Sequence, residues 1–291
     1  MEKTNIAFVV GATGYTGKAV VKALRARGIE TYAHVRPDSK ALSEHRSHFE
    51  AQGAHVDSTP FTEAALLETF NRLKPSVIFA LLGTTRSRRA TDNDGGDYRA
   101  VDYGLTATVL KAAVRAGGQG GCSGNPDRAG GVDVGRGQGA KARQYPEVSQ
   151  AFATPSSADR RPAGDGSGYQ DSPLSRFVYL SAAGVGPNSR VEYVRVRWQM
   201  ETELRASGLP FTIARPAIIT GPDRPEGRPT ERLAAGIGDA ALGLLGKLGG
   251  RDFAERYQSM SGDVLAAGLV RLAYDPEGAG RVVSGPDLRS T

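Results

Sequence analysis

The chain has 291 residues, 39% of them hydrophobic, and its 37 basic residues outnumber 31 acidic ones to give a formal net charge of +6. This length allows one large core or two modest ones. The basic residues are scattered, without a dense run or interleaved aromatic residues, so a soluble protein with a basic surface or an anionic ligand is favoured over a nucleic-acid-binding protein.

Cysteine content and hydropathy point to a cytoplasmic protein. The single cysteine, Cys122, excludes an internal disulfide framework and fits a reducing compartment. No segment reaches the roughly 18–20 apolar residues that a membrane span requires. The opening residues "MEKTN" lack a signal-peptide pattern and lead directly into "IAFVVGATG". We therefore expect a cytoplasmic chain without a membrane span.

The first 28 residues predict a strand, a glycine turn and an amphipathic helix. The β-branched run ends at Gly11, after which Val20, Val21 and Leu24 recur with helical spacing, and Gly28 closes the helix. Further along the chain we expect strands within 29–39, 53–61, 74–86, 176–184, 210–221 and 280–285, and helices within 62–73, 97–117, 191–208 and 261–275. Thr62 is the expected cap of the helix that follows it. This alternation predicts an α/β fold, a Rossmann-type doubly wound parallel sheet, as a single domain over 1–291.

Residues 117–175 interrupt this alternation. A helix-to-strand connection takes roughly 2–6 residues, but 59 are present here, and 117–140 contain ten glycines. The span 117–173 has only four residues from the set Val, Ile, Leu, Met, Phe and Trp, which is too few to order it by burial. We expect a low-complexity, disordered insertion. A functional lid and out-of-frame or unspliced coding sequence are the alternatives.

The glycine turn predicts a dinucleotide site. Its motif is a GxxGxxG, in which glycines let the backbone approach a pyrophosphate while the following helix N-terminus supplies amides and a favourable dipole. It follows a strand and opens a helix, the context that such a motif needs. The alternative is a purely structural turn. The candidate cofactor-binding residues of this turn are Gly11, Thr13, Gly14, Tyr15, Thr16 and Gly17.

Two further strand ends add to this site. The second strand is followed by Arg36, with Lys40 nearby, where an acidic residue would have favoured NAD. Since arginine pairs well with phosphate, NADP is the expected cofactor and NAD the alternative, unless Arg36 is only a solvated loop residue. At the end of a central strand, "LLGTTR" makes Leu82, Gly83 and Thr84 further candidates, the alternative being a plain strand-ending turn.

Taken in order, the glycine motif, "LLGTTR", "VYLSAAG", Tyr193 and "FTIARPAIITGPDR" resemble the atypical short-chain dehydrogenase/reductase superfamily. Within it they are most similar to the branch that contains the HIV-1 Tat-interactive protein and its NAD(P)-binding bacterial relatives. The resemblance covers residues 5–116 and 176–290. It implies an NADP-binding Rossmann domain, in which residues 216–291 shape the substrate pocket.

The same resemblance implies a reaction centre. Ser181 would hydrogen-bond the substrate carbonyl, the alternative being a plain strand-terminal hydroxyl, and Tyr193 would donate or accept the proton. Arg197 occupies the position where the family has a lysine that orients the nicotinamide ribose and lowers the pKa of the tyrosine. Arginine keeps the charge but cannot join a proton relay; the alternative for Arg197 is a surface residue on an amphipathic helix. Pro216 would lie beside the nicotinamide, the alternative being that it only supplies rigid backbone geometry.

These features leave three functions open. The first is an NADP-dependent oxidoreductase acting on an unidentified small carbonyl or alcohol, whose activity the arginine makes uncertain. The second is a non-catalytic NADP-binding regulatory or scaffold protein, and the third a sugar-nucleotide epimerase. The four histidines show no metal-ligand spacing, so no metal site is expected. Nothing in the sequence indicates a nucleic-acid partner or sets the oligomeric state.

Overall fold

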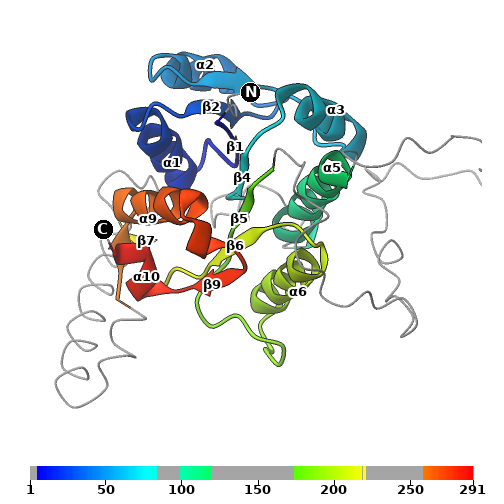
Figure 1. The fold of residues 1–291 in the computed structure, drawn as a ribbon, viewed down its shortest axis with the longest axis vertical. Helices are drawn as coiled ribbons and strands as arrows, with labels where there is room; N and C mark the ends of the chain where they lie inside the picture. The colour runs from blue at the N-terminus through cyan, green and yellow to red at the C-terminus, as the bar shows by residue number, and fades with distance from the viewer. Residues whose placement is uncertain (1–4, 84–98, 119–173, 218, 221–257, 291) are drawn as a thin grey trace, which may run out of the picture.

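A computed structural model describes residues 5–83, 99–118, 174–217, 219–220 and 258–290. Thr84 and nearly all of the expected insertion lie outside this part of the chain, as does most of the expected substrate-pocket region. The predictions made for those residues therefore stay predictions. Figure 1 shows the described elements in colour.

Seven parallel strands form one sheet, in the order β3-β2-β1-β4-β5-β6-β9. The two central strands, β1 and β4, are buried along their whole length, as is usual for a parallel sheet covered on both faces. This strand order confirms the doubly wound, Rossmann-type fold. The strands are β1 (Ile6–Val10), β2 (Glu30–His34), β3 (His55–Asp57), β4 (Val77–Ala80), β5 (Arg176–Leu180), β6 (Phe211–Ala214) and β9 (Arg281–Val283).

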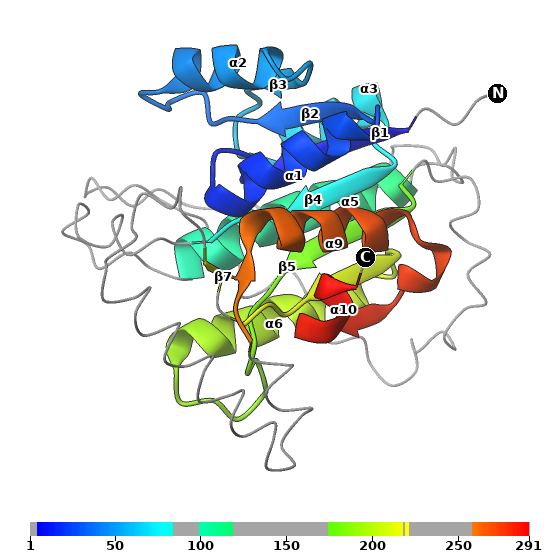
Figure 2. The same ribbon diagram turned by 90° about the vertical axis from the view of Figure 1, so that its left-hand side faces the viewer.

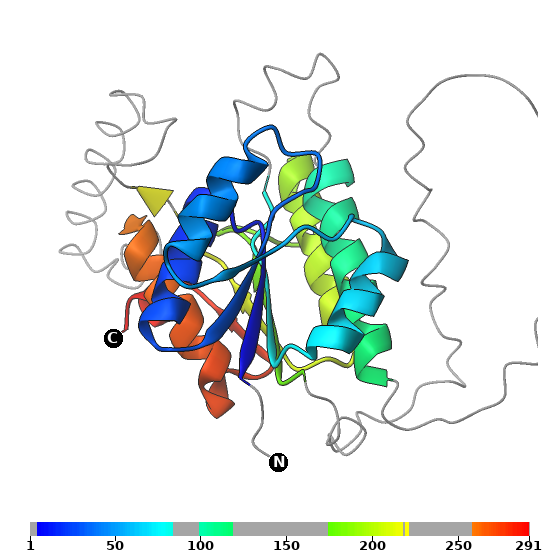
Figure 3. The ribbon, with the colours of Figure 1, turned by 90° about the horizontal axis from the view of Figure 1, so that it is seen from above.

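Helices cover both faces of the sheet, as the view from above shows (Figure 3). One layer holds α1 (Tyr15–Ala26), α2 (Leu42–Glu50), α9 (Gly262–Tyr274) and α10 (Gly285–Arg289). The other holds α3 (Glu63–Leu73), α5 (Thr106–Gly118) and α6 (Glu192–Ala206), with the π-helical turn η1 (Arg99–Leu105) leading into α5. Smaller elements are the 3-10 turn η5 (Pro276–Gly278) and the two-stranded pair of β7 (Ile219–Thr220) with β8 (Met260–Ser261).

Each face of the sheet carries its own hydrophobic core. On one side Val20, Leu24 and Leu269 of α1 and α9 pack onto the sheet, and these two helices lie side by side (Figure 2). On the other side Leu110 and Met200 of α5 and α6 are completely buried. The two layers hold the sheet rigidly, so the residues that follow its strands are fixed at its carboxyl edge.

Most expected elements are confirmed, and the differences have local causes. The Thr62 hydroxyl accepts from the Ala65 amide and caps α3, and Gly28 adopts the left-handed conformation with φ +70° after α1. Helix α2 was not expected, because Phe49 is its one buried residue and it shows no apolar stripe. The helix expected over 97–117 begins, within the described residues, as the π-helical turn η1.

Candidate cofactor and active site

The glycine turn and the "LLG" stretch lie next to each other. Strands β1 and β4 are neighbours, and the Leu81 amide donates to the Val10 carbonyl at 3.0 Å. The chain leaves β1 toward β2 on one side and leaves β4 toward β5 on the other. Ligands of doubly wound sheets bind beyond the carboxyl ends of the strands at such a point, so the geometry agrees with the sequence-based site.

Two of the three motif glycines are required by close approach of the backbone. Gly11 has φ +81°, and a Cβ added to it would lie 2.8 Å from the carbonyl carbon of Leu81. A Cβ on Gly17 would lie 2.1 Å from the Gly11 carbonyl oxygen. Gly11 therefore allows the turn to pack on β4, and Gly17 allows α1 to pack on the turn.

Gly14 differs from the other two, because it faces outward. It is exposed, it is the N-cap of α1, and no side chain caps the helix or places a negative charge in its first turn. An exposed helix N-terminus of this kind suits an anionic group. The residues present thus fit a dinucleotide pyrophosphate, since the backbone at Gly14 is exposed at the start of α1.

The side chains in this turn have different surroundings. Thr16 is buried and Thr13 partly buried. The Tyr15 hydroxyl donates to the Thr220 carbonyl at 3.2 Å and accepts from the Gly262 amide at 3.4 Å. Tyr15 therefore links the glycine turn to β7 and to the start of α9.

Arg36 lies two residues beyond β2, at the same edge of the sheet. Its side chain is 48% exposed, and its contact with Asp38 is long, with Nη1 and Oδ2 3.7 Å apart. An exposed pair at this distance contributes little to stability. The guanidinium can therefore turn to an anionic ligand at small energetic cost.

Arg197 is not a surface residue of an amphipathic helix, which corrects that alternative. It is 3% exposed, and Nη2 lies 2.5 Å from Oδ1 of Asp102, a carboxylate with no exposure. Nη2 also donates to the Leu82 carbonyl at 3.1 Å. Nη1 donates to the Leu180 carbonyl at 2.6 Å and to the Tyr179 hydroxyl at 3.2 Å.

These four bonds use every terminal N–H of the guanidinium, since each terminal nitrogen carries two hydrogens. Nε is buried and has no hydrogen-bond partner among the described residues. Burial opposes the charge of Arg197, but the Tyr179 and Tyr193 phenols and the Asp102 carboxylate outweigh it and raise the pKa above its ordinary value. Arg197 is therefore permanently charged.

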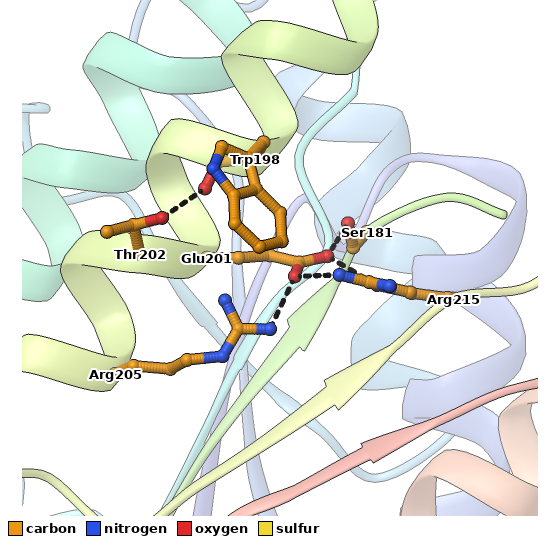
Figure 4. Close-up of polar contacts among 6 residues, drawn as sticks. All are labelled: Ser181, Trp198, Glu201, Thr202, Arg205 and Arg215. Carbon is orange, nitrogen blue, oxygen red and sulfur yellow. Dashed lines mark hydrogen bonds and ion pairs between the residues drawn. The ribbon is translucent and has the colours of Figure 1, made fainter. Parts of the chain in front are cut away.

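Ser181 belongs to a second buried polar cluster, centred on Glu201 of α6 (Figure 4). Ser181 is 4% exposed and donates its hydroxyl proton to Glu201 Oε1 at 2.6 Å. Arg215 binds both oxygens of the carboxylate, through Nε at 2.9 Å and Nη2 at 2.5 Å. Arg205 donates to Oε2 at 2.8 Å, and its guanidinium lies 5.3 Å from the Trp198 ring centroid.

The charge of Glu201 is secured by this cluster. Burial alone would raise the pKa of the carboxyl, but the hydrogen bonds from Arg215, Ser181 and Arg205 lower it below its ordinary value. The ionised carboxylate can only accept hydrogen bonds, so the one proton of Ser181 is fixed on it. Ser181 then offers lone pairs, rather than a proton, to any further partner.

Tyr193 and Pro216 flank these clusters. Tyr193 stands in the first turn of α6 and is partly buried, with its ring centroid 5.2 Å from the Arg197 guanidinium carbon. Pro216 follows β6, is buried, and accepts at its carbonyl from the Ala183 amide at 2.9 Å. Tyr193, Arg197 and Glu201 therefore form one row along α6, at one-turn spacing, facing the strand ends.

The sequence did not reveal Asp102, which pairs with Arg197, Glu201, which accepts from Ser181, or Arg215, which binds Glu201. Only Glu201 left a signal, because it continues the i, i+4 spacing of Tyr193 and Arg197. Within the described residues, no group of three or more His, Cys, Asp or Glu side chains could hold a metal ion. The helices of the same residues include none that could cross a membrane.

Comparison with known proteins gives a family for the N-terminal part of the chain. Residues 7–121 match the NAD dependent epimerase/dehydratase family. This match covers only the N-terminal part of the chain, and together with the seven-stranded parallel sheet it agrees with the resemblance to the atypical short-chain dehydrogenase/reductase superfamily.

A curated relative and three solved structures are similar to the chain. Protein fmp52, mitochondrial, from Aspergillus niger is 35% identical over 80 residues, which are 27% of this chain and 32% of that protein. A structure described as an epimerase, from Burkholderia cenocepacia J2315, has a TM-score of 0.54 at 18% identity, covering 97% of this chain and 75% of the other. The enzyme WbmH of Bordetella bronchiseptica, in complex with NAD+, gives 0.53 at 15% identity over 96% and 74%.

The third structure is leucoanthocyanidin reductase of Vitis vinifera in complex with NADPH, with a TM-score of 0.52 at 12% identity over 96% of this chain and 67% of that one. At these identities the structures show the shared fold. The curated match spans about a third of the Aspergillus protein, so the activity of that whole protein says nothing directly about this chain.

Proposed function

We propose that the chain is an NADP-dependent oxidoreductase acting on a small carbonyl or alcohol. The observation that carries the proposal is the adjacency of the glycine turn and the Leu82–Gly83 backbone at the carboxyl edge of β1 and β4. Gly14 would present the N-terminus of α1 to the pyrophosphate, and Arg36 would pair with the ribose 2′-phosphate. NADPH-like cofactors supply a hydride when bound.

In this proposal Tyr193 carries the proton. Its phenol stands at the end of α6 nearest the strand ends, and the permanent charge of Arg197 lies against its ring. Because Arg197 is held by Asp102 and by two backbone carbonyls, it acts on Tyr193 through its field rather than by proton transfer.

Ser181 takes a changed role in the proposed reaction. Its proton is fixed on Glu201, so it would accept a hydrogen bond from a hydroxyl rather than donate one to a carbonyl oxygen. This favours a hydroxyl group as the species that Ser181 would contact, either in an alcohol substrate or in the alcohol formed from a carbonyl substrate.

One observation favours a second function, a non-catalytic NADP-binding regulatory or scaffold protein. All four terminal N–H groups of Arg197 already have partners within the chain, so the guanidinium has only buried Nε left for a bound ligand. A site that cannot hold the nicotinamide half of the cofactor could still bind the adenosine half. Nucleotide binding without turnover would follow.

Thermal unfolding with NADPH or NADH, followed by turnover with a panel of alcohols and carbonyl compounds, tests the proposal. We expect NADPH to raise the unfolding temperature and Tyr193→Phe to abolish turnover without changing NADPH affinity. Tyr32→Phe, on β2, is the matched control and should keep both properties. Binding without turnover by any panel member would favour the regulatory function, and no shift with either nucleotide would reject both.

Two cellular compartments fit the chain. A chain with a single cysteine fits a reducing compartment such as the cytoplasm, whereas the named Aspergillus niger relative is mitochondrial. Fractionation of cells expressing the full chain decides between the two compartments.

A further inference from the structure

We propose that Asp102 is a positioning residue for cofactor binding, acting through Arg197 on the backbone of Leu82 and Gly83. The inference rests on the proposed binding of a dinucleotide at this edge, but not on turnover. It assigns a role to a residue of η1 that no sequence motif marks, and it gives Arg197 a supporting role at the site beside its proposed action on Tyr193.

The first observation is that the ion pair of Arg197 and Asp102 contacts the backbone after β4, where the cofactor would bind. Arg197 Nη2 bonds both Asp102 and the Leu82 carbonyl, so the same nitrogen joins the carboxylate to the chain that follows β4. A Cβ placed on Gly83 would lie 3.2 Å from that nitrogen and 3.7 Å from Asp102 Oδ1. A side chain at position 83 would therefore meet the ion pair, so the Gly83 backbone lies close to it.

The second observation is the span of the guanidinium. Its other terminal nitrogen bonds the Leu180 carbonyl, at the end of β5, while Nη2 bonds the Leu82 carbonyl beyond β4. One side chain thus fixes the separation of two neighbouring strand ends. Asp102 holds this fork in place, because it is the carboxylate within bonding distance and is itself completely buried.

The stability of the fold does not by itself explain the ion pair of Arg197 and Asp102. A buried ion pair is costly to desolvate, and replacing one by apolar residues of similar size is often neutral for stability or favourable. Stability alone therefore gives no strong reason for this pair. Correct placement of the backbone that would contact the cofactor does give a reason for the pair, because a small displacement of such a backbone weakens ligand binding.

The experiment compares NADPH affinity and thermal stability in the full-length chain. Asp102→Leu combined with Arg197→Met replaces the pair by apolar side chains, and Asp102→Asn removes the charge with little change in shape. We expect the double variant to keep its stability and Asp102→Asn to be less stable, because the buried Arg197 charge loses its counter-charge. Both folded variants should bind NADPH about tenfold more weakly or worse.

Arg176→Met is the matched control. Arg176 is also a buried arginine, bonded to the Thr212 hydroxyl and to the Leu272 and Asp275 carbonyls, but it stands at the first residue of β5, at the opposite edge of the sheet. Its replacement should lower the unfolding temperature and leave the NADPH dissociation constant unchanged.

The outcomes separate the inference from the proposed function. Absence of NADPH binding by the unaltered chain would reject the proposed function itself. If the unaltered chain binds NADPH and either folded Asp102 variant binds it with wild-type affinity, the inference alone would be overturned. If the double variant does not fold, Asp102→Asn decides the question by the same comparison with Arg176→Met.

Discussion

Arg197 and Asp102 form an ion pair at 2.5 Å, with side chains 4% and 0% exposed, between the ends of β4 and β5. The arginine comes from α6 and the carboxylate from η1, so the pair joins two helical segments to the carboxyl edge of the sheet. Position 197 is therefore part of the framework of the site, whatever it contributes to a reaction.

The first prediction concerns the stability of this framework. Arg197→Met leaves a buried carboxylate without its cation, and we expect the free energy of unfolding to fall by about 3–5 kcal/mol. Arg197→Lys keeps the charge but loses the forked contacts to Leu82 and Leu180, so its loss should be smaller. Urea unfolding measures both, and a loss below about 1 kcal/mol for Arg197→Met would contradict the burial of the pair.

The second prediction separates two glycines of one motif. Gly17→Ala should destabilise the fold by about 1–3 kcal/mol, because its Cβ would lie 2.1 Å from the Gly11 carbonyl oxygen. Gly14→Ala should change stability by less than about 1 kcal/mol, since this exposed N-cap has φ −73° and its Cβ would lie 3.3 Å from the Gly11 carbonyl oxygen. Instead, Gly14→Ala should weaken NADPH binding, measured by titration of the folded variant. Equal effects of the two variants on stability would be inconsistent with this account.

The third prediction concerns pH. The pKa of Glu201 lies below its ordinary value of 4.5 in the folded chain, so ionisation of this carboxyl stabilises the fold above pH 4.5. That contribution is lost as the pH falls through the folded-state pKa. In urea unfolding, Glu201→Gln should therefore be less stable than wild type near neutral pH, and the difference should shrink below pH 4.5.

The control for this pH series is Glu63→Gln. Glu63 pairs with Arg115 at the surface, with side chains 35% and 59% exposed, and an exposed pair contributes little. A Glu201→Gln difference that stays constant from neutral to acid pH would show that the carboxylate charge is not what stabilises this cluster.

The fourth prediction concerns the choice of cofactor. Arg36→Gln should lower NADPH affinity about tenfold or more and leave NADH affinity unchanged, since only NADPH carries the 2′-phosphate. Stability should change by less than about 0.5 kcal/mol, because the contact of Arg36 with Asp38 is exposed and long. Equal losses for the two nucleotides, measured by fluorescence titration, would mean that Arg36 does not read the phosphate.

Sequence patterns were sufficient for the centre of the sheet because β1 and β4 are continuous apolar runs. The run "VIFA" becomes β4 and is wholly buried, as expected of a central parallel strand. Helix α2 escaped prediction because a single residue, Phe49, fixes it to the core. An element held by one contact leaves no periodic signal.

The site was predictable where it depends on backbone and much less where it depends on buried charge. Gly11 and Gly17 predict the turn, because no other residue fits their positions. Asp102 and Arg197 are 95 residues apart in the chain, and only folding brings them together. A charged residue on a helix looks the same in sequence whether it faces solvent or a buried partner.

Calorimetric titration of the full-length chain with NADPH and NADH tests the central claim most directly. The account predicts saturable binding of NADPH, with clearly weaker binding of NADH, and weakened NADPH binding in Gly14→Ala with a stability change below about 1 kcal/mol. Absence of binding for both nucleotides by the folded, unaltered chain would contradict it.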